Sequence, residues 1–275
     1  THIYNEGLPH ESVALEGVTF SAQDGQLLGI IGHTGSGKST LVQHLNGLLK
    51  PKSGSIVVGG TDITSDGVVM RDIRKKIGLV FQYPEYQLFE ETVAKDVAFG
   101  PANLGLSEAE IDECVKEAIE MVGLDYEKVK NVSPFELSGG QKRRAAIAGV
   151  IAMKPEVLIL DEPTAGLNPK AHADILNMVE TIHRKSKNII FLVSHNMNDI
   201  ARMSDKVLVM NHGRLVMDGT PAEVFSREEE LKSMGLALPD SMEIMMRLKK
   251  AGMDINTDCL TMDEAAEEIA KVLAK

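Results

Sequence analysis

A glycine-rich run that ends in lysine and serine is the most chemically specific feature of the sequence. Residues 32–39 read GHTGSGKS and fit the pattern G-x-x-x-x-G-K-S/T, between a short apolar run and a helical spacing of apolar residues. Glycines let backbone N–H groups close around phosphate oxygens, and the following helix adds the positive end of its dipole. We expect Lys38 to reach the β- and γ-phosphates of a nucleotide and the Ser39 hydroxyl to bind Mg²⁺. The alternative is a plain glycine turn.

The predicted nucleotide-binding residues extend over the whole run and one residue beyond it. His33 and Thr34 occupy variable positions of the pattern, so no specific chemistry is assigned to their side chains. The set is Gly32, His33, Thr34, Gly35, Ser36, Gly37, Lys38, Ser39 and Thr40.

Two adjacent carboxylates end a second apolar run. Asp161 and Glu162 follow Val157–Leu160 directly, which places them at the carboxyl end of a predicted buried strand, where open α/β sheets bind ligands. After a phosphate loop in the same chain, such an aspartate typically supports Mg²⁺. The next residue, Glu162, is then placed to polarise an attacking water, unless it is only a solvated carboxylate at the end of a strand.

A third polar run opens another helix. The segment Leu137, Ser138, Gly139, Gly140 and Gln141 precedes a predicted helix over 142–153, and a helix that begins in this way presents backbone amides to an anion. One nucleotide cannot easily use both this helix N-terminus and that of the phosphate loop.

The elements that position these residues alternate between strands and helices. Apolar runs predict strands over 27–31, 55–58, 77–81, 157–160, 189–193 and 206–210, and apolar spacing predicts helices over 38–49 and 170–184. Such alternation indicates a parallel sheet covered by helices. Two capping boxes, Ser107 with Glu110 and Thr261 with Glu264, mark further helix starts. The first residues are expected to end a strand, with another edge strand upstream.

Composition excludes several classes of protein. The net charge of −11 argues against non-specific binding to nucleic acid or to an anionic lipid surface. No apolar run approaches the roughly 20 residues of a membrane-spanning helix, so we expect a soluble, intracellular chain. Cys114 and Cys259 are far apart and fit neither a disulfide framework nor a zinc site.

The three motifs together resemble those of ATP-binding cassette (ABC) ATPases. Gln141 lies twenty residues before Asp161, which is similar to the spacing between the LSGGQ signature and the Walker B aspartate of that family. The resemblance covers Tyr4 to about Pro221. It implies an α/β fold with a P-loop NTPase (RecA-like) core, a mostly parallel sheet, an antiparallel β edge and ATP with Mg²⁺ as cofactors. In the family two cassettes pair head to tail, so that each signature completes the partner's ATP site.

The resemblance also divides the chain. It implies a cassette over 1–220, with an inserted helical signature subdomain over about 90–154. Residues 221–275 form a small C-terminal helical extension, rich in methionine, which we expect to be either a packed tail or a contact with a dimer partner.

Three further residues match family positions one by one, and a fourth departs from the pattern. Gln82 resembles the Q-loop glutamine that senses Mg²⁺ and the γ-phosphate, and His195 resembles the switch histidine that acts with Glu162 in hydrolysis. Tyr4 is placed like the aromatic residue that stacks on adenine. Asn168 departs from the pattern, because the family usually has aspartate at this D-loop position, and amide hydrogen bonding survives there without the charge. The expected metal ligands are Ser39, Gln82 and Asp161.

The segment after Gln82 narrows the resemblance. Residues 82–89, QYPEYQLF, and the His33-Thr34 phosphate loop resemble ATPase subunits of energy-coupling factor (ECF) transporters, which take up vitamins and transition-metal ions. In the wider family this region receives a coupling helix from a membrane subunit. We expect an acidic groove with an apolar floor, made by Glu85, Tyr86, Phe89 and Glu90 together with Glu91, that accepts a basic, partly apolar helix. The alternative is an exposed acidic loop.

The resemblance implies a transport-coupled ATPase at the cytoplasmic face of the cell membrane. Its expected partners are a second ABC ATPase, with a heterodimer favoured over a homodimer, a transmembrane coupling subunit and a substrate-binding membrane subunit. Nucleic acid is not expected. Two alternatives stay open, an ATPase of another ABC importer subclass and a soluble ABC protein of translation or DNA repair.

Overall fold

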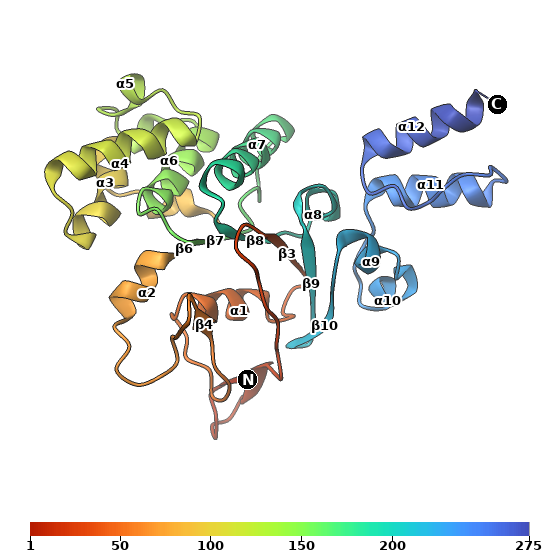
Figure 1. The fold of residues 1–275 in the computed structure, drawn as a ribbon, viewed down its shortest axis with the longest axis horizontal. Coiled ribbons are helices and arrows are strands. Elements are labelled where there is room, and N and C mark those ends of the chain that lie inside the picture. Colours follow the sequence, from red (N-terminus) through yellow and green to blue (C-terminus); the bar gives the residue numbers. More distant parts are fainter. Residues whose placement is uncertain (275) are drawn as a thin grey trace. The chain divides into compact units, whose positions relative to one another are not determined.

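The computed structural model describes residues 1–274 (Figure 1). The chain divides into two compact units. The first unit contains Thr1–Ala22, Gln26–Lys38 and the chain from Ser194 onward, and the second contains Gln23–Gly25 and Ser39–Val193. Each unit has its own strands and helices, and each holds part of the predicted chemistry.

The first unit is built on strand β3 (Leu27–Ile31), which is buried along its whole length. Strand β9 (Lys206–Asn211) runs parallel to β3, and β10 (Arg214–Gly219) pairs with β9 in the antiparallel sense. Helix α8 (Met197–Met203) packs against β3. The antiparallel β9 and β10 pair is the predicted antiparallel edge.

The second unit contains three parallel strands, of which β7 is the middle one. Strands β6 (Ile77–Val80), β7 (Val157–Asp161) and β8 (Ile189–Val193) are almost entirely buried. Helix α7 (Pro169–Ser186) connects β7 to β8 and buries one apolar face. Runs of this composition, buried on both faces, are typical of parallel sheets with helical crossovers.

A helical region interrupts the strands of the second unit between β6 and β7. Helices α3, α4 and α6 pack against one another (Figure 1, yellow to green). The predicted capping box of Ser107 and Glu110 is present at the start of α4. The elements of the region are α3 (Val93–Leu104), α4 (Glu108–Met121), α5 (Tyr126–Val129), the 3-10 helix η2 (Pro134–Glu136) and α6 (Gly139–Ile151).

Helix α1 (Lys38–Leu45) is shorter than its apolar spacing predicts. Gly47 adopts a left-handed conformation with φ of 68°, and the N–H of Leu48 turns back to donate to the carbonyl of Gln43. Glycine takes this conformation at little cost, so it ends the helix before Leu48 and Leu49. The remaining short elements are β1 (His2–Tyr4), β2 (Ser12–Leu15), β4 (Val57–Val58), β5 (Thr61–Asp62), α2 (Met70–Lys76) and the 3-10 helix η1 (Pro84–Gln87).

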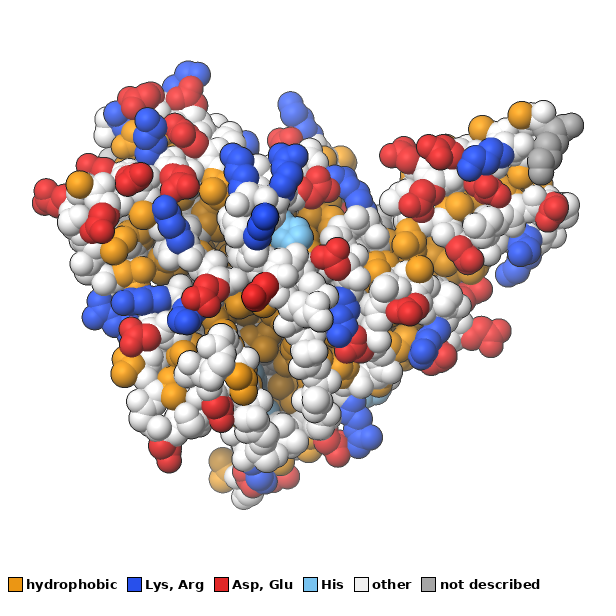
Figure 2. Space-filling model, in the orientation of Figure 1, with side chains coloured by type: hydrophobic (Ala, Val, Ile, Leu, Met, Phe, Trp, Pro, Cys, Tyr) orange, Lys and Arg blue, Asp and Glu red, His pale blue; other side chains and the backbone are white. Residues whose placement is uncertain are grey.

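The chain beyond Gly219 is helical throughout its described elements. The last two helices, α11 and α12, pack together around a small core of Met245, Ile255, Cys259 and Ala265. Acidic side chains lie on the outside of these two helices (Figure 2). The elements are α9 (Pro221–Phe225), α10 (Glu228–Ser233), α11 (Asp240–Lys250) and α12 (Met262–Leu273).

No helix within residues 1–274 combines the length and the apolar character that crossing a membrane requires.

Candidate functional site

The glycine-rich loop connects β3 to α1, as predicted from the sequence. Two of its glycines are required by close backbone approach. A Cβ on Gly32 would lie 2.3 Å from the carbonyl oxygen of Met210, and one on Gly37, whose φ is 103°, would lie 2.8 Å from that of Ala14. The loop is therefore a tight cradle that side chains would fill, which suits a phosphate group held by backbone N–H groups.

Lys38 lies inside this cradle. Its side chain is 7% exposed, and its ammonium group donates to the carbonyl of Gly32 at 2.6 Å and to that of His33 at 3.1 Å. Ser39 follows in the first turn of α1. A buried lysine that spans a glycine loop at a helix N-terminus supplies a concentrated positive charge for an anion.

His195 lies in the same unit as Lys38, just after the end of β8. Burial disfavours the imidazolium form, and the positive charge of Lys38 acts in the same direction, so that the pKa of His195 is lowered. This lowered pKa favours the neutral imidazole, which can both accept and donate a hydrogen bond.

Asp161 and Glu162 end β7 in the second unit, as predicted. Asp161 is 8% exposed, and Glu162 has a φ of 51°, a left-handed conformation that few residues other than glycine adopt. The N–H of Glu162 donates to the carbonyl of Val193, and its carbonyl accepts from the N–H of Ala165. Such strained backbone persists only where its surroundings fix it, and it is concentrated at functional sites.

The signature residues form the start of α6. Ser138 is the N-cap residue, and its hydroxyl accepts from the N–H of Gln141 while the Gln141 side chain accepts from the N–H of Ser138 at 3.0 Å. Sequence reasoning missed this capping box, although the spacing S-x-x-Q was its signal. Leu137, Gly139 and Gly140 complete the turn.

Asn168, at the D-loop position, has a structural role in the chain itself. Its side chain accepts from the N–H of Ala171 at 2.9 Å and caps α7, with Pro169 in the first turn. Asparagine and aspartate are about equally good N-caps, so the departure from the family residue preserves the helix. Tyr4, in β1 of the first unit, is 39% exposed and has its ring 4.6 Å from that of His2.

The predicted docking segment differs from expectation in its charge. Glu85 forms a bidentate ion pair with Arg143 of α6, at 2.6 and 2.9 Å, and its side chain is only 17% exposed. Burial alone would raise its pKa, but the hydrogen bonds and charge of Arg143 outweigh burial and lower the pKa of Glu85. Tyr86 and Phe89 are exposed, at 84% and 57%. An acid with an internal partner is not available as a docking charge.

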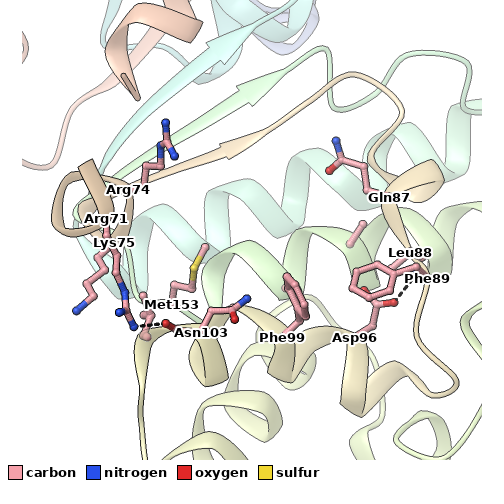
Figure 3. Close-up of a pocket in the computed structure, with 14 residues that line it drawn as sticks. Arg71, Arg74, Lys75, Gln87, Leu88, Phe89, Asp96, Phe99, Asn103 and Met153 are labelled. Atoms are coloured by element: carbon pink, nitrogen blue, oxygen red, sulfur yellow. Dashed lines mark hydrogen bonds between the residues drawn. The ribbon is translucent and has the colours of Figure 1, made fainter. Parts of the chain in front are cut away.

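A groove of about 780 Å³ lies beside this segment, between α2, α3 and α6 (Figure 3). Phe89 and Phe99 meet edge to face in it, with ring centroids 5.1 Å apart. Asp96 holds one end by accepting from the N–H groups of Phe89 and Glu90, both at 2.9 Å. The rim formed by α2 carries three basic residues, Arg71, Arg74 and Lys75. The groove is thus apolar with a basic side, whereas the sequence predicted an acidic one.

Comparison with known proteins supports a specific family. The family model described as "ABC transporter" matches residues 15–165. The chain is 59% identical over 271 residues to "Energy-coupling factor transporter ATP-binding protein EcfA2" of Caldanaerobacter subterraneus subsp. tengcongensis, covering 98% of this chain and 94% of that protein. It is 57% identical over 274 residues to the protein of the same name from Clostridioides difficile, covering 99% and 95%.

Solved structures agree with this. One, described as cbiO1 from Clostridium perfringens, part of the ABC transporter complex cbiONQ, has a TM-score of 0.74 and 37% identity, covering 91% of this chain and 94% of that one. Another is a dimeric post-hydrolysis state of the cassette MJ0796 bound to ADP and Pi, with a TM-score of 0.70 and 26% identity, covering 80% and 95%.

Proposed function

The chain belongs to the ABC transporter family, among the ATP-binding proteins of energy-coupling factor transporters, and on that premise we propose how its residues couple ATP hydrolysis to uptake. The chain is the ATP-binding, energy-coupling subunit, and it hydrolyses ATP. We propose that the imported solute is a vitamin or a transition-metal ion. The observation that carries the proposal is the phosphate cradle of residues 32–39, with the buried ammonium group of Lys38 inside it.

ATP is held by the glycine-rich cradle, by the first turn of α1 and by Tyr4. The cradle residues donate N–H groups to the phosphates, Lys38 neutralises the β- and γ-phosphate oxygens, and Thr40 extends the first turn of α1. Tyr4 stacks on the adenine ring, for which its exposed ring face is suited.

Three oxygen donors fit a magnesium ion. Ser39 offers a hydroxyl, Gln82 an amide carbonyl and Asp161 a buried carboxylate, and all three belong to the second unit. Hard oxygen donors with few carboxylates are the ligands that Mg²⁺ prefers beside phosphates. When bound, the ion neutralises charge on the β- and γ-phosphates.

Glu162 and His195 carry the hydrolytic step. Glu162 accepts a hydrogen bond from the attacking water and orients it toward the γ-phosphate. The lowered pKa of His195 favours its neutral form, which keeps one ring N–H and donates a hydrogen bond through it to a γ-phosphate oxygen. Gln82 contacts Mg²⁺ and the γ-phosphate, and it connects the ATP-bound site to the docking segment that follows it in the chain.

Two cassettes are needed for turnover. The N–H groups at the start of α6, with the hydroxyl of Ser138, face the ATP of a partner cassette, and residues 165–168 contact the partner's phosphate loop. The partner is a second ABC ATPase, and the His33-Thr34 loop favours a heterodimer over a homodimer. The helices beyond Gly219 form an extension to the 1–220 cassette that contributes a dimer contact.

The groove beside α2 receives a coupling helix of a transmembrane subunit, which in turn holds a substrate-binding membrane subunit. The apolar centre at Phe89 and Phe99 suits an apolar side chain. The basic rim of α2 suits an acidic end of that helix, while Glu90 suits a basic one. The chain is thereby held at the cytoplasmic face of the membrane.

The test is to express the chain with the other subunits of its transporter, purify the membrane complex and measure ATP hydrolysis and solute uptake in vesicles. We expect hydrolysis to require Mg²⁺ and both cassettes, and a bound vitamin or metal ion to copurify. Phe99→Ala should weaken assembly with the membrane subunit. Val57→Ala, which also truncates an exposed apolar side chain but away from the groove, should not. An unchanged complex with Phe99→Ala would remove the docking assignment.

A further inference from the structure

Arg143 is the most thoroughly buried charged residue of the second unit, and the chemistry described so far does not use it. Its side chain is 1% exposed. It lies on α6, five residues after Ser138 and two residues after Gln141, where the signature ends. A buried guanidinium persists only where hydrogen bonds satisfy it, so its partners reveal what it holds.

Those partners belong to two different functional segments. On one side Nε and Nη2 donate to the two carboxylate oxygens of Glu85, in the docking segment. On the other side Nη1 donates to the carbonyl of Pro163 at 3.2 Å and to that of Ala165 at 2.6 Å. One planar group therefore joins η1, the signature helix and the turn directly after Glu162.

The turn that it holds is the one that places Glu162. Glu162 has left-handed backbone, and its carbonyl accepts from the N–H of Ala165, whose own carbonyl accepts from Arg143. Arg143 thus binds the carbonyls of two of the three residues that directly follow Glu162, namely Pro163 and Ala165. Backbone in such a conformation needs external contacts to stay in it.

The docking segment touches the same place a second time. Tyr83, also in left-handed backbone with φ of 56°, lies with its ring 5.7 Å from the Arg143 guanidinium carbon. Its Cε1 atom would be 3.4 Å from a Cβ on Gly166, within the D-loop. Tyr86, one residue after Glu85, is 84% exposed. Glu85 and Tyr83 therefore connect the docking segment to the turn after Glu162 through their contacts with Arg143 and Gly166.

We infer that Arg143 is a positioning residue for hydrolysis: its guanidinium ties the docking segment at Glu85 to the carbonyls of Pro163 and Ala165, so that the seating of the membrane partner sets the orientation of Glu162. This inference rests on the proposed function, since it assumes that Glu162 orients water and that residues 82–89 meet a membrane subunit. It adds a connection between the docking segment and the turn after Glu162 that does not pass through Gln82 or any other residue assigned above.

The planar fork makes a sharp test possible. Arg143→Lys keeps the charge but cannot span Glu85 and both carbonyls at once. The double variant Glu85→Leu with Arg143→Met replaces the buried pair by apolar groups of similar size, which buried ion pairs generally tolerate without loss of stability. The matched control is Glu117→Gln, which breaks another ion pair of the second unit, between Glu117 of α4 and Lys154 just after α6, at 2.7 Å, where both side chains are half exposed.

All variants are measured in the purified transporter complex for kcat, KM for ATP and melting temperature. We expect both Arg143 variants to lower kcat roughly tenfold or more, with KM within about twofold, because a displaced general base slows the chemical step without weakening ATP binding. The double variant Glu85→Leu with Arg143→Met should have a melting temperature close to that of the wild type and still have a lowered kcat. Glu117→Gln should match the wild type in all three quantities.

If Arg143 had a purely structural role, kcat would fall only in those variants whose melting temperature also falls. If the Leu and Met pair melts like the wild type and keeps a wild-type kcat, or if Arg143→Lys does so when assayed well below its melting temperature, the inference is overturned. Should the double variant fail to fold, Arg143→Lys decides alone. If the wild-type complex itself did not hydrolyse ATP, the proposed function would be overturned instead.

Discussion

The positive charge of Lys38 reaches the imidazole of His195, within one compact unit of the chain. Partial loss of solvent around His195 is the larger effect, and both effects lower the pKa of the imidazole. The histidine and the phosphate loop are therefore electrostatically linked.

The linkage predicts a pH dependence with a definite sign. The folded protein binds the His195 proton more weakly than the unfolded chain, whose imidazole has a pKa of about 6.5. The contribution of His195 to the free energy of unfolding is therefore fully present above pH 6.5. It is lost as the pH falls through 6.5 toward the pKa of the folded state. An NMR titration should place the midpoint of His195 below 6.5. Lys38→Met should move it part of the way back, because burial remains; a midpoint above 6.5 in the wild type would contradict this.

Glu162→Gln should abolish ATP turnover while ATP binding survives. The amide keeps the shape and the backbone of the turn but cannot accept a proton from water. Hydrolysis and equilibrium binding of ATP, measured on the same complex, separate the two effects, and the variant should also favour the closed cassette dimer. Wild-type turnover would remove Glu162 from its assigned role.

Gly37→Ala should destabilise the protein and weaken ATP binding, whereas Gly54→Ala should only destabilise it. Both glycines have similar left-handed backbone, with φ of 103° and 100°, so each alanine costs about 1 kcal/mol or more. Only at Gly37 would the new Cβ also clash, 2.8 Å from the Ala14 carbonyl, whereas nothing lies within 4 Å of one at Gly54. Melting curves and ATP titrations compare the two, and equal ATP affinities would contradict the cradle.

Asn168→Asp should leave the free energy of unfolding nearly unchanged, while Asn168→Ala should lower it by about 1 kcal/mol. The side-chain oxygen that accepts from Ala171 N–H is present in aspartate and absent in alanine. Denaturant melts measure this directly. If Asn168→Asp also alters turnover in the complex, the charge acts across the dimer and not within the chain.

Cys259 should react slowly with iodoacetamide in the folded protein. It is 5% exposed in the core of α11 and α12, and burial, aided by nearby acids, raises the pKa of its thiol. Less thiolate and less access both slow alkylation. The variant Cys114→Ser isolates the signal, and guanidinium should accelerate it. Fast labelling of the folded variant would show that the two helices do not pack as described.

Local patterns in the sequence predicted much of the fold and site. The run 32–39, the apolar strands ending at Asp161 and Val193, and the capping boxes at Ser107 and Thr261 depend on residues a few positions apart. Their physics is local, so their structure follows from spacing alone.

What the sequence did not predict depends on tertiary packing. The Glu85 and Arg143 pair joins residues 58 positions apart, and neither has a local feature that marks its partner. The ion pair neutralises the charge of Glu85, on which the prediction of an acidic groove depended. Arg71, Arg74 and Lys75 of α2 make one side of the groove basic. Gly47 ended α1 early although the apolar spacing continued, because the left-handed turn at glycine is favourable enough to override periodicity.

The Ser138 hydroxyl has two uses that do not compete. Its oxygen accepts from Gln141 N–H, and its own proton remains to be donated elsewhere, since a hydroxyl both accepts and donates. Capping α6 in its own chain thus fixes the oxygen in place before any second cassette arrives. Replacement of Ser138 should therefore have two effects. It should lower the stability of its own subunit and weaken ATP binding in the partner cassette.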